Sequence, residues 1–139
     1  MNHIISSQSL IPVIKAEKKN NGADFTIKSL QTGKEYTYRI TRKDYNGNWF
    51  TFISVEHEYQ KFIRLGYYAN GNIIKARNVV ETPSAKAIAY VLNKIEQNKI
   101  NLLDNQVHIM HTGNCLRCGR PLTDSHSIEV GLGPICENL

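Results

Sequence analysis

The cysteines constrain this chain more than any other feature, because all three follow residue 114. Cys115 and Cys118 are separated by two residues, a spacing at which one tight turn can bring two thiolates to a single metal ion. Cys136 follows Gly133-Pro134, so it should lie near the start of a helical turn, where a thiolate is favoured electrostatically. An odd number of cysteines argues against a disulfide framework. The pattern predicts a metal site, and zinc suits its sulfur ligands best.

Zinc prefers four tetrahedral ligands, so three cysteines leave one position to fill. His111 is the first candidate, because it lies on the predicted strand that leads into Cys115. His126, which precedes Cys136, is the second candidate, and Asp124 or a water molecule are further options. The H-E-x-x-H and H-x-E motifs of zinc hydrolases and deaminases are absent from the sequence. We therefore expect a structural metal and no enzymatic activity, with a zinc hydrolase as the weakest alternative.

The region before the cysteines has the pattern of an antiparallel sheet. Residues 36–41 alternate between apolar and polar side chains, and residues 49–55 form a largely apolar run. Asn46-Gly47 and Asn70-Gly71 are strong hairpin signals, because both residue types tolerate a positive φ angle. We expect four to six strands between residues 24 and 80.

One helix is indicated after the sheet. Thr82 can cap it and Pro83 suits its first position, where no backbone N–H is needed. Apolar residues then recur at three- and four-residue spacing from Ala85 to Ile95, which predicts one apolar face packed on the sheet.

The sequence divides into three parts. Residues 1–23 form a lead-in segment, in which the apolar patch 10–14 is expected to pack as an edge strand and the run 15–22 to be solvated. Residues 24–105 form an α+β sheet-and-helix domain, and residues 106–139 form the zinc-binding module. The predicted fold class is α+β: an antiparallel sheet with one packed helix and a C-terminal treble-clef-like zinc module.

Positive charge is concentrated away from the cysteines. Residues 1–100 carry 15 Lys/Arg and 8 Asp/Glu, a balance of +7, whereas residues 101–139 carry 2 and 4, a balance of −2. Aromatic residues lie among these cations, a pattern typical of proteins that bind single-stranded nucleic acid, although the same rings could instead form the core. The candidate contacts to nucleic acid or to a partner are Arg39, Arg42, Lys43, Arg64, Lys75 and Arg77.

The C-terminal sequence resembles a known family. The segment His111–Thr123, then Ser127-Ile128, then residues 131–136 follow the pattern H-x3-C-x2-C-G-R-x-L-T…G-x-G-P-x-C. This is similar to the C-terminal signature of a family of small uncharacterised proteins from phages, plasmids and bacteria. The resemblance implies that His111, rather than His126, is the fourth ligand. It implies no particular activity, only an origin in a mobile element.

These features predict a non-enzymatic, zinc-stabilised, phage-type accessory protein that contacts nucleic acid or a nucleic-acid-handling complex. The alternative is an anti-defence inhibitor, for example of a CRISPR nuclease complex, that acts by protein–protein binding. No stretch of 18 apolar residues occurs and the N-terminal residues lack a signal-peptide pattern, so we expect a cytoplasmic protein without a membrane partner.

Overall fold

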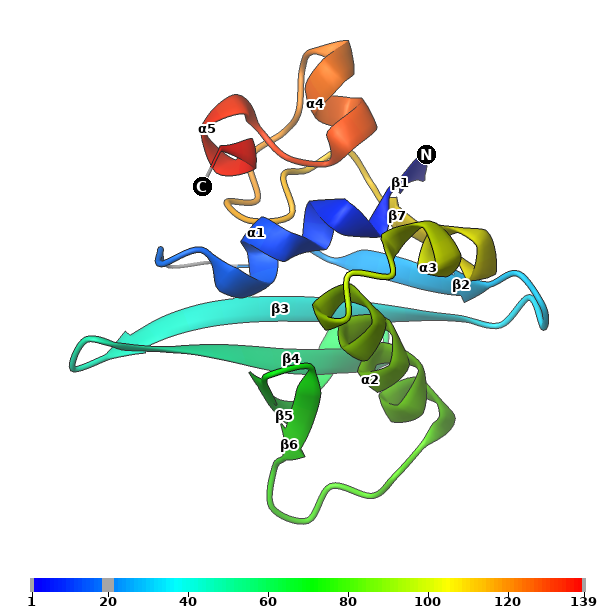
Figure 1. The fold of residues 1–139 in the computed structure, drawn as a ribbon, viewed down its shortest axis with the longest axis vertical. Coiled ribbons are helices and arrows are strands. Elements are labelled where there is room, and N and C mark those ends of the chain that lie inside the picture. The colour runs from blue at the N-terminus through cyan, green and yellow to red at the C-terminus, as the bar shows by residue number, and fades with distance from the viewer. Residues whose placement is uncertain (1, 19–21, 139) are drawn as a thin grey trace.

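A single antiparallel sheet organises the computed structural model, which describes residues 2–18 and 22–138 (Figure 1). The alternating segments predicted from the sequence form its central strands. The predicted Asn-Gly turns join them into hairpins, and Asn46, Gly47, Asn70 and Gly71 have the positive φ angles that such turns require. The strands are β1 (His3–Ile5), β2 (Phe25–Ser29), β3 (Glu35–Tyr45), β4 (Asn48–Glu58), β5 (Lys61–Ala69), β6 (Asn72–Lys75) and β7 (Val107–His111).

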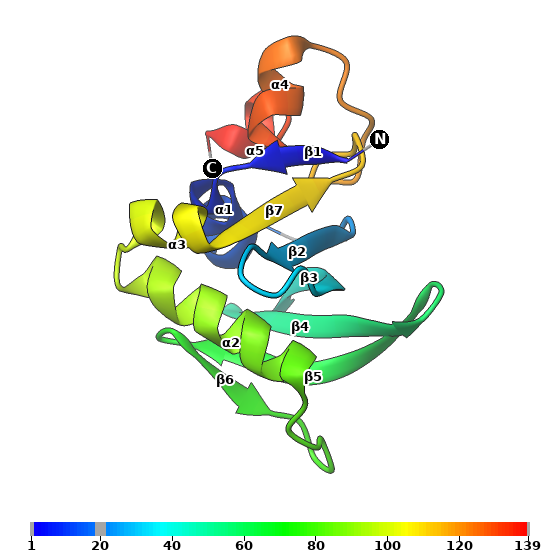
Figure 2. The ribbon, with the colours of Figure 1, turned by 90° about the vertical axis from the view of Figure 1, so that its right-hand side faces the viewer.

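The order of the strands interleaves the two ends of the chain. The sheet runs β1-β7-β2-β3-β4-β5-β6, and each neighbouring pair is antiparallel (Figure 2). β7 lies between β1 and β2, so that His111 is opposite His3 on one side and Phe25 on the other. The strand that leads into the cysteines is therefore held inside the sheet by the N-terminal segments.

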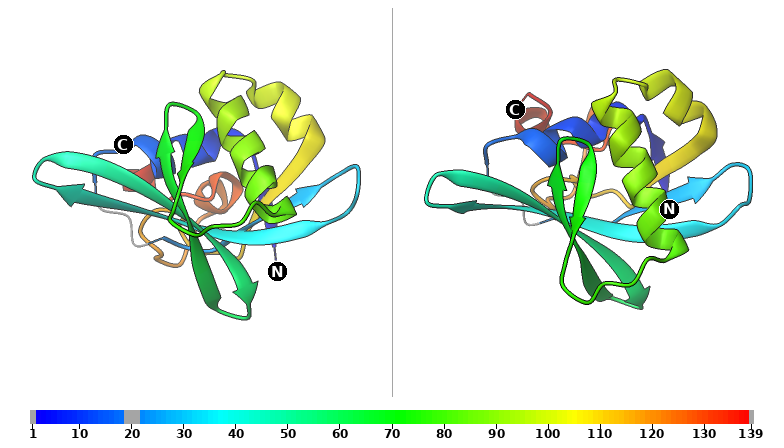
Figure 3. Two further views of the ribbon diagram at one scale, coloured as in Figure 1. Left: turned by 90° about the horizontal axis from the view of Figure 1, so that it is seen from below. Right: turned by 60° about the horizontal axis from the view of Figure 1, so that its bottom comes forward.

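The helices are α1 (Leu10–Lys15), α2 (Pro83–Glu96), α3 (Ile100–Gln106), α4 (Ser125–Val130) and α5 (Pro134–Glu137). The predicted helix is confirmed as α2, since the Thr82 side chain accepts the backbone N–H of Ala85 and Pro83 begins the helix. α1, α2 and α3 lie on one side of β3 and β4 (Figure 3). α4 and α5 belong to the C-terminal module.

One hydrophobic core spans the sheet, the helices and the module. Tyr38 and Ile40 of β3 point into it and are almost fully buried, whereas Arg39 and Thr41, which alternate with them, point to the opposite face. The described residues place no helix on that opposite face, which we call the open face. The C-terminal module contributes Cys115, Leu116, Leu132 and Cys136 to the core.

The lead-in segment differs from the prediction. The apolar patch 10–14 was expected to be an edge strand, and this is wrong because Leu10–Lys15 forms α1. Its buried residues Leu10, Val13 and Ile14 have the three- and four-residue spacing of a helix face. The N-terminal segment instead supplies an edge strand through β1, next to β7. Of the run 15–22, residues 19–21 lie outside the described residues.

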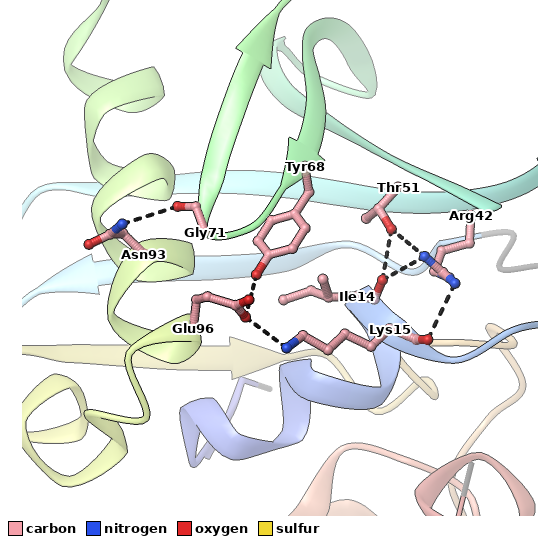
Figure 4. Close-up of polar contacts among 8 residues, drawn as sticks. All are labelled: Ile14, Lys15, Arg42, Thr51, Tyr68, Gly71, Asn93 and Glu96. Atoms are coloured by element: carbon pink, nitrogen blue, oxygen red, sulfur yellow. Dashed lines mark hydrogen bonds and ion pairs between the residues drawn. The ribbon is translucent and has the colours of Figure 1, made fainter. Parts of the chain in front are cut away.

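Polar side chains attach α1 to the sheet and to α2. Lys15 Nζ and the Tyr68 hydroxyl both lie 2.7 Å from the Glu96 carboxylate (Figure 4). These two hydrogen bonds hold the pKa of Glu96 below its ordinary value. Arg42 reaches the same C-terminal end of α1 from β3, and its guanidinium donates to the carbonyls of Ile14 and Ala16. Among the described residues, no helix has the length and apolar character that a membrane crossing requires.

Candidate metal centre

Cys115 and Cys118 lie on a small hairpin immediately after β7. The N–H of Cys115 donates to the carbonyl of Arg120 at 2.8 Å, and the N–H of Gly119 donates back to the carbonyl of Cys115 at 2.9 Å. Gly119 has φ +77°, a conformation that favours glycine at the point where the turn exits. Local hydrogen bonds thus fix the predicted C-x2-C turn.

Cys136 is brought to this hairpin by two short helices. α4 ends at Val130 and is capped by Gly131, whose φ is +82°. The chain then turns back so that the Gly131 carbonyl accepts the N–H of Leu116 at 3.0 Å. Pro134 then begins α5, and Cys136 is its third residue. The N–H of Gly133, just before α5, points to Cys115 Sγ at 3.4 Å.

The three sulfurs converge. The Sγ atoms of Cys115, Cys118 and Cys136 lie within 4.8 Å of one another, and no other described His, Cys, Asp or Glu completes such a group elsewhere. All three are free thiols, with Cys118 exposed and the other two buried. A pocket of about 160 Å³ adjoins them, with Asp124 and Ser127 in its wall. The three cysteines could therefore hold a metal ion.

The electrostatics of the sulfurs favour a bound cation. Burial would raise the pKa of Cys115, but N–H groups of Cys118, Gly133 and Arg117 outweigh it and keep that pKa below its ordinary value. Burial and the two neighbouring cysteines raise the pKa of Cys136 to about 11. The fold thus favours the thiolate form of Cys115. A positive ion between the sulfurs would remove the mutual repulsion that opposes ionisation of the other two thiols.

Arg117 is a residue of this centre that the sequence analysis did not identify. It is the residue before Cys118, it is almost fully buried, and its guanidinium donates to Cys136 Sγ at 3.8 Å and to the carbonyl of Lys18 at 2.9 Å. A buried guanidinium beside the Cys136 sulfur can supply positive charge to a thiolate there. Its position inside the C-x2-C turn was the available signal, but spacing alone does not show whether such a side chain points inward.

The structure does not bring His111 to the sulfurs. Its ring is fully buried, with Nε2 2.6 Å from the Ile128 carbonyl and Nδ1 accepting the Gly113 N–H at 3.0 Å. Both ring nitrogens therefore bind backbone groups, and His111 ties β7 to α4 instead of facing the cysteines. Burial lowers its pKa, which favours the neutral ring that this pair of hydrogen bonds requires.

His111→Ala is therefore expected to keep one metal ion per chain while losing stability. The variant removes two hydrogen bonds and leaves a cavity, and we expect the free energy of unfolding to fall by about 3 kcal/mol. Metal analysis and urea unfolding of the same preparation measure both quantities. Loss of the metal from a variant that is still folded would restore His111 as the fourth ligand.

The other two candidates for the fourth ligand also have partners. His126 Nε2 lies 2.9 Å from the Glu137 carboxylate, on the exposed side of α5. The Asp124 carboxylate caps α4 by accepting the N–H of Ser127 at 3.0 Å. Of these two, Asp124 lines the pocket beside the sulfurs.

The six basic residues predicted to contact nucleic acid or a partner do not lie on one shared surface. Arg42 is only 6% exposed, and its guanidinium donates to carbonyls at the end of α1, so it is not part of an exposed basic surface. Lys75 forms an ion pair with Glu81 at the edge of the sheet. Arg77 lies exposed beyond β6.

Arg39, Arg64 and Lys43 lie on the open face. The Arg39 guanidinium carbon lies 4.1 Å from the centre of the Phe62 ring, and its N–H groups also bind Asp24. The Arg64 guanidinium carbon lies 4.1 Å from the centre of the Phe52 ring. Lys43 pairs with Phe50 across β3 and β4.

Four aromatic rings gather beside these cations. Phe50 lies at the centre, with ring centroids 5.6 Å from Tyr45, 6.3 Å from Phe52 and 6.0 Å from Tyr67. We call Tyr45, Phe50, Phe52 and Tyr67 the aromatic cluster. Tyr45 is 49% exposed and Tyr67 is 37% exposed. The sequence left open whether these rings belong to the core, and the structure places the cluster outside it.

Comparison with known proteins gives one match. Residues 108–138 match DUF6011, a family of unknown function. The match covers β7, the cysteine hairpin and both helices of the module, so the C-terminal part of the chain is similar to an uncharacterised family. No curated protein and no solved structure matches the chain.

Proposed function

We propose that this protein is a zinc-stabilised, non-enzymatic accessory protein that binds single-stranded nucleic acid on the open face of its sheet. The aromatic cluster, flanked by Arg39, Arg64 and Lys43, is the observation that carries this proposal. A mobile-element origin agrees with the resemblance of the C-terminal sequence.

Zinc is the ion that the donor set suits best. Cys115, Cys118 and Cys136 offer three sulfurs, which are soft ligands typical of structural zinc. Three thiolates around Zn²⁺ leave one net negative charge, and the buried guanidinium of Arg117 balances it. The remaining ligand would come from the adjoining pocket, as the Asp124 carboxylate or a water molecule. A hairpin followed by a cysteine in a short helix is a treble-clef-like arrangement.

The open face offers the two kinds of contact that a single strand needs. Exposed rings can stack on bases, and base stacking of this kind contributes about 1–3 kcal/mol per base. Guanidinium groups held over neighbouring rings can contact phosphates without leaving the face. The strand could thus lie across β3, β4 and β5, where rings and cations alternate.

The basic balance of residues 1–100 supports the same surface. The aromatic cluster and the cations Arg39, Lys43 and Arg64 beside it all come from this part of the chain, which carries a net charge of +7. Its attraction to phosphate would be long-range and sensitive to salt, because binding releases counterions.

The test is a double substitution, Tyr45→Ala with Tyr67→Ala. Both side chains are partly exposed, so the fold should tolerate their loss, and we expect affinity for a fluorescent 20-nucleotide single strand to fall by about 30-fold or more. Tyr59→Ala is the matched control, because Tyr59 is 85% exposed and lies outside the cluster. Fluorescence anisotropy at several salt concentrations measures both variants.

Two outcomes would contradict the proposal. One is equal affinity of the double variant and the Tyr59→Ala control. The other is no binding of the single strand by the metal-loaded wild type at low salt, which would favour the alternative of an inhibitor that binds a protein.

A further inference from the structure

A wide cleft lies between the N-terminal segment and the C-terminal module, and none of its lining residues belongs to the aromatic cluster. Its volume is about 900 Å³, and it is enclosed by β1, the start of α1, the end of α3 and the C-terminal helices α4 and α5. We call it the terminal cleft. It is separate from the pocket beside the cysteines, since the two share no lining residue.

The terminal cleft combines an apolar lining with acidic groups. Ile4, Ile11 and Val130 contribute apolar side chains, and Asp104, Glu129 and Glu137 contribute carboxylates. Among the described residues that line it, none is a lysine or an arginine. The cleft is thus negative in a chain whose formal net charge is +5.

Its carboxylates are fixed at different points of the cleft wall. Asp104 accepts the Ser6 hydroxyl at 2.6 Å and the Ser7 N–H at 2.8 Å, which holds the end of α3 against the N-terminal segment. Glu137 lies on α5 and pairs with His126 of α4. Glu129 is exposed on α4. The negative charge therefore comes from three helices, α3, α4 and α5.

We propose that the terminal cleft docks a lysine- or arginine-rich amphipathic segment of a partner protein. The apolar lining would take the apolar side of the segment, and the carboxylates would pair with its cations. A nucleic acid is disfavoured here, because its phosphates would face carboxylates without a compensating lysine or arginine. The cleft would thus give the protein a second binding surface of opposite charge to the open face.

The partner probe is a 14-residue peptide with lysine and leucine at helical spacing. We expect saturable 1:1 binding to the metal-loaded protein by isothermal titration calorimetry, and no binding of the matched glutamate–leucine peptide. Glu129→Lys should weaken binding of the lysine peptide by about tenfold, because it replaces attraction by repulsion within the cleft. Glu35→Lys is the control, because Glu35 is exposed at the start of β3 and does not line the cleft.

Equal effects of Glu129→Lys and Glu35→Lys would overturn the proposal, because the attraction would then depend on overall charge alone. The absence of saturable binding to the wild type would also overturn it. Affinity of Glu129→Lys for a single-stranded oligonucleotide should not fall, which separates this inference from the function proposed for the open face.

Discussion

Removal of the zinc ion that we propose for the three cysteines is expected to unfold the C-terminal module and to destabilise the whole chain. Structural zinc contributes about 10–16 kcal/mol of apparent binding free energy in zinc-finger peptides, where it drives folding. Here the module shares the hydrophobic core with the sheet, through residues that include Cys115, Leu116 and Leu132. Part of the fold should therefore survive without metal, and we expect a loss of about 5 kcal/mol or more, seen as a fall in melting temperature of about 15 °C or more.

Cys118→Ser separates loss of metal from loss of packing. Cys118 is the exposed member of the three, so serine at this position should disturb the core little. The variant should bind less than one zinc per chain and should melt near the temperature of the wild type in excess chelator. Chelator should then have no further effect on it, whereas the wild type should regain its stability when zinc is restored.

The measurements are zinc content by elemental analysis and thermal unfolding by circular dichroism, with and without chelator. A variant that keeps one tightly bound zinc per chain would show that Cys118 is not a ligand. Wild-type protein that contains no stoichiometric metal and melts at the same temperature in chelator would contradict the metal centre itself.

Local sequence patterns predicted much of the fold. The alternation at 36–41, the Asn-Gly turns and the Thr82-Pro83 start are short-range signals, and the hairpins and α2 follow them. The sequence did not predict α1 as a helix, because a short apolar patch is compatible with a strand as well as with a helix. β1 could not be predicted, since the pairing of His3 with His111 is a contact between the two ends of the chain.

In the candidate site, too, the sequence predicted what depends on short-range patterns and missed what depends on contacts between distant segments. The C-x2-C spacing and the glycines before Cys136 predicted that the sulfurs would be close together, and they are. The sequence placed His111 on the strand that leads into Cys115, but it gave no information on the Ile128 carbonyl that the ring of His111 would meet. Arg42 could have been recognised, because it follows Tyr38 and Ile40 at two-residue spacing on the buried face of β3.

Arg42→Met is expected to lower the free energy of unfolding by about 4 kcal/mol. The Arg42 guanidinium donates to the Ile14 carbonyl at 2.8 Å and to the Thr51 hydroxyl at 2.6 Å (Figure 4). It also donates to the Ala16 carbonyl at 2.6 Å. Hydrogen bonds from a charged donor contribute about 1.5–3 kcal/mol each, and the variant loses those of the guanidinium. The loss is limited because the Ile14 carbonyl keeps the Thr51 hydroxyl as a donor and the Ala16 carbonyl keeps the Lys18 N–H. Methionine fills a similar volume but supplies no N–H group.

Arg39→Met is the matched control on the same strand. Arg39 points to the open face, and its ion pair with Asp24 is partly exposed, so we expect the loss of stability to stay below about 1 kcal/mol. Urea unfolding of both variants in the metal-loaded state provides the comparison. The two variants should also differ in binding: of the two folded proteins, only Arg39→Met should bind single-stranded nucleic acid more weakly than the wild type. Equal losses of stability would mean that the buried guanidinium of Arg42 is not what holds α1 to the sheet.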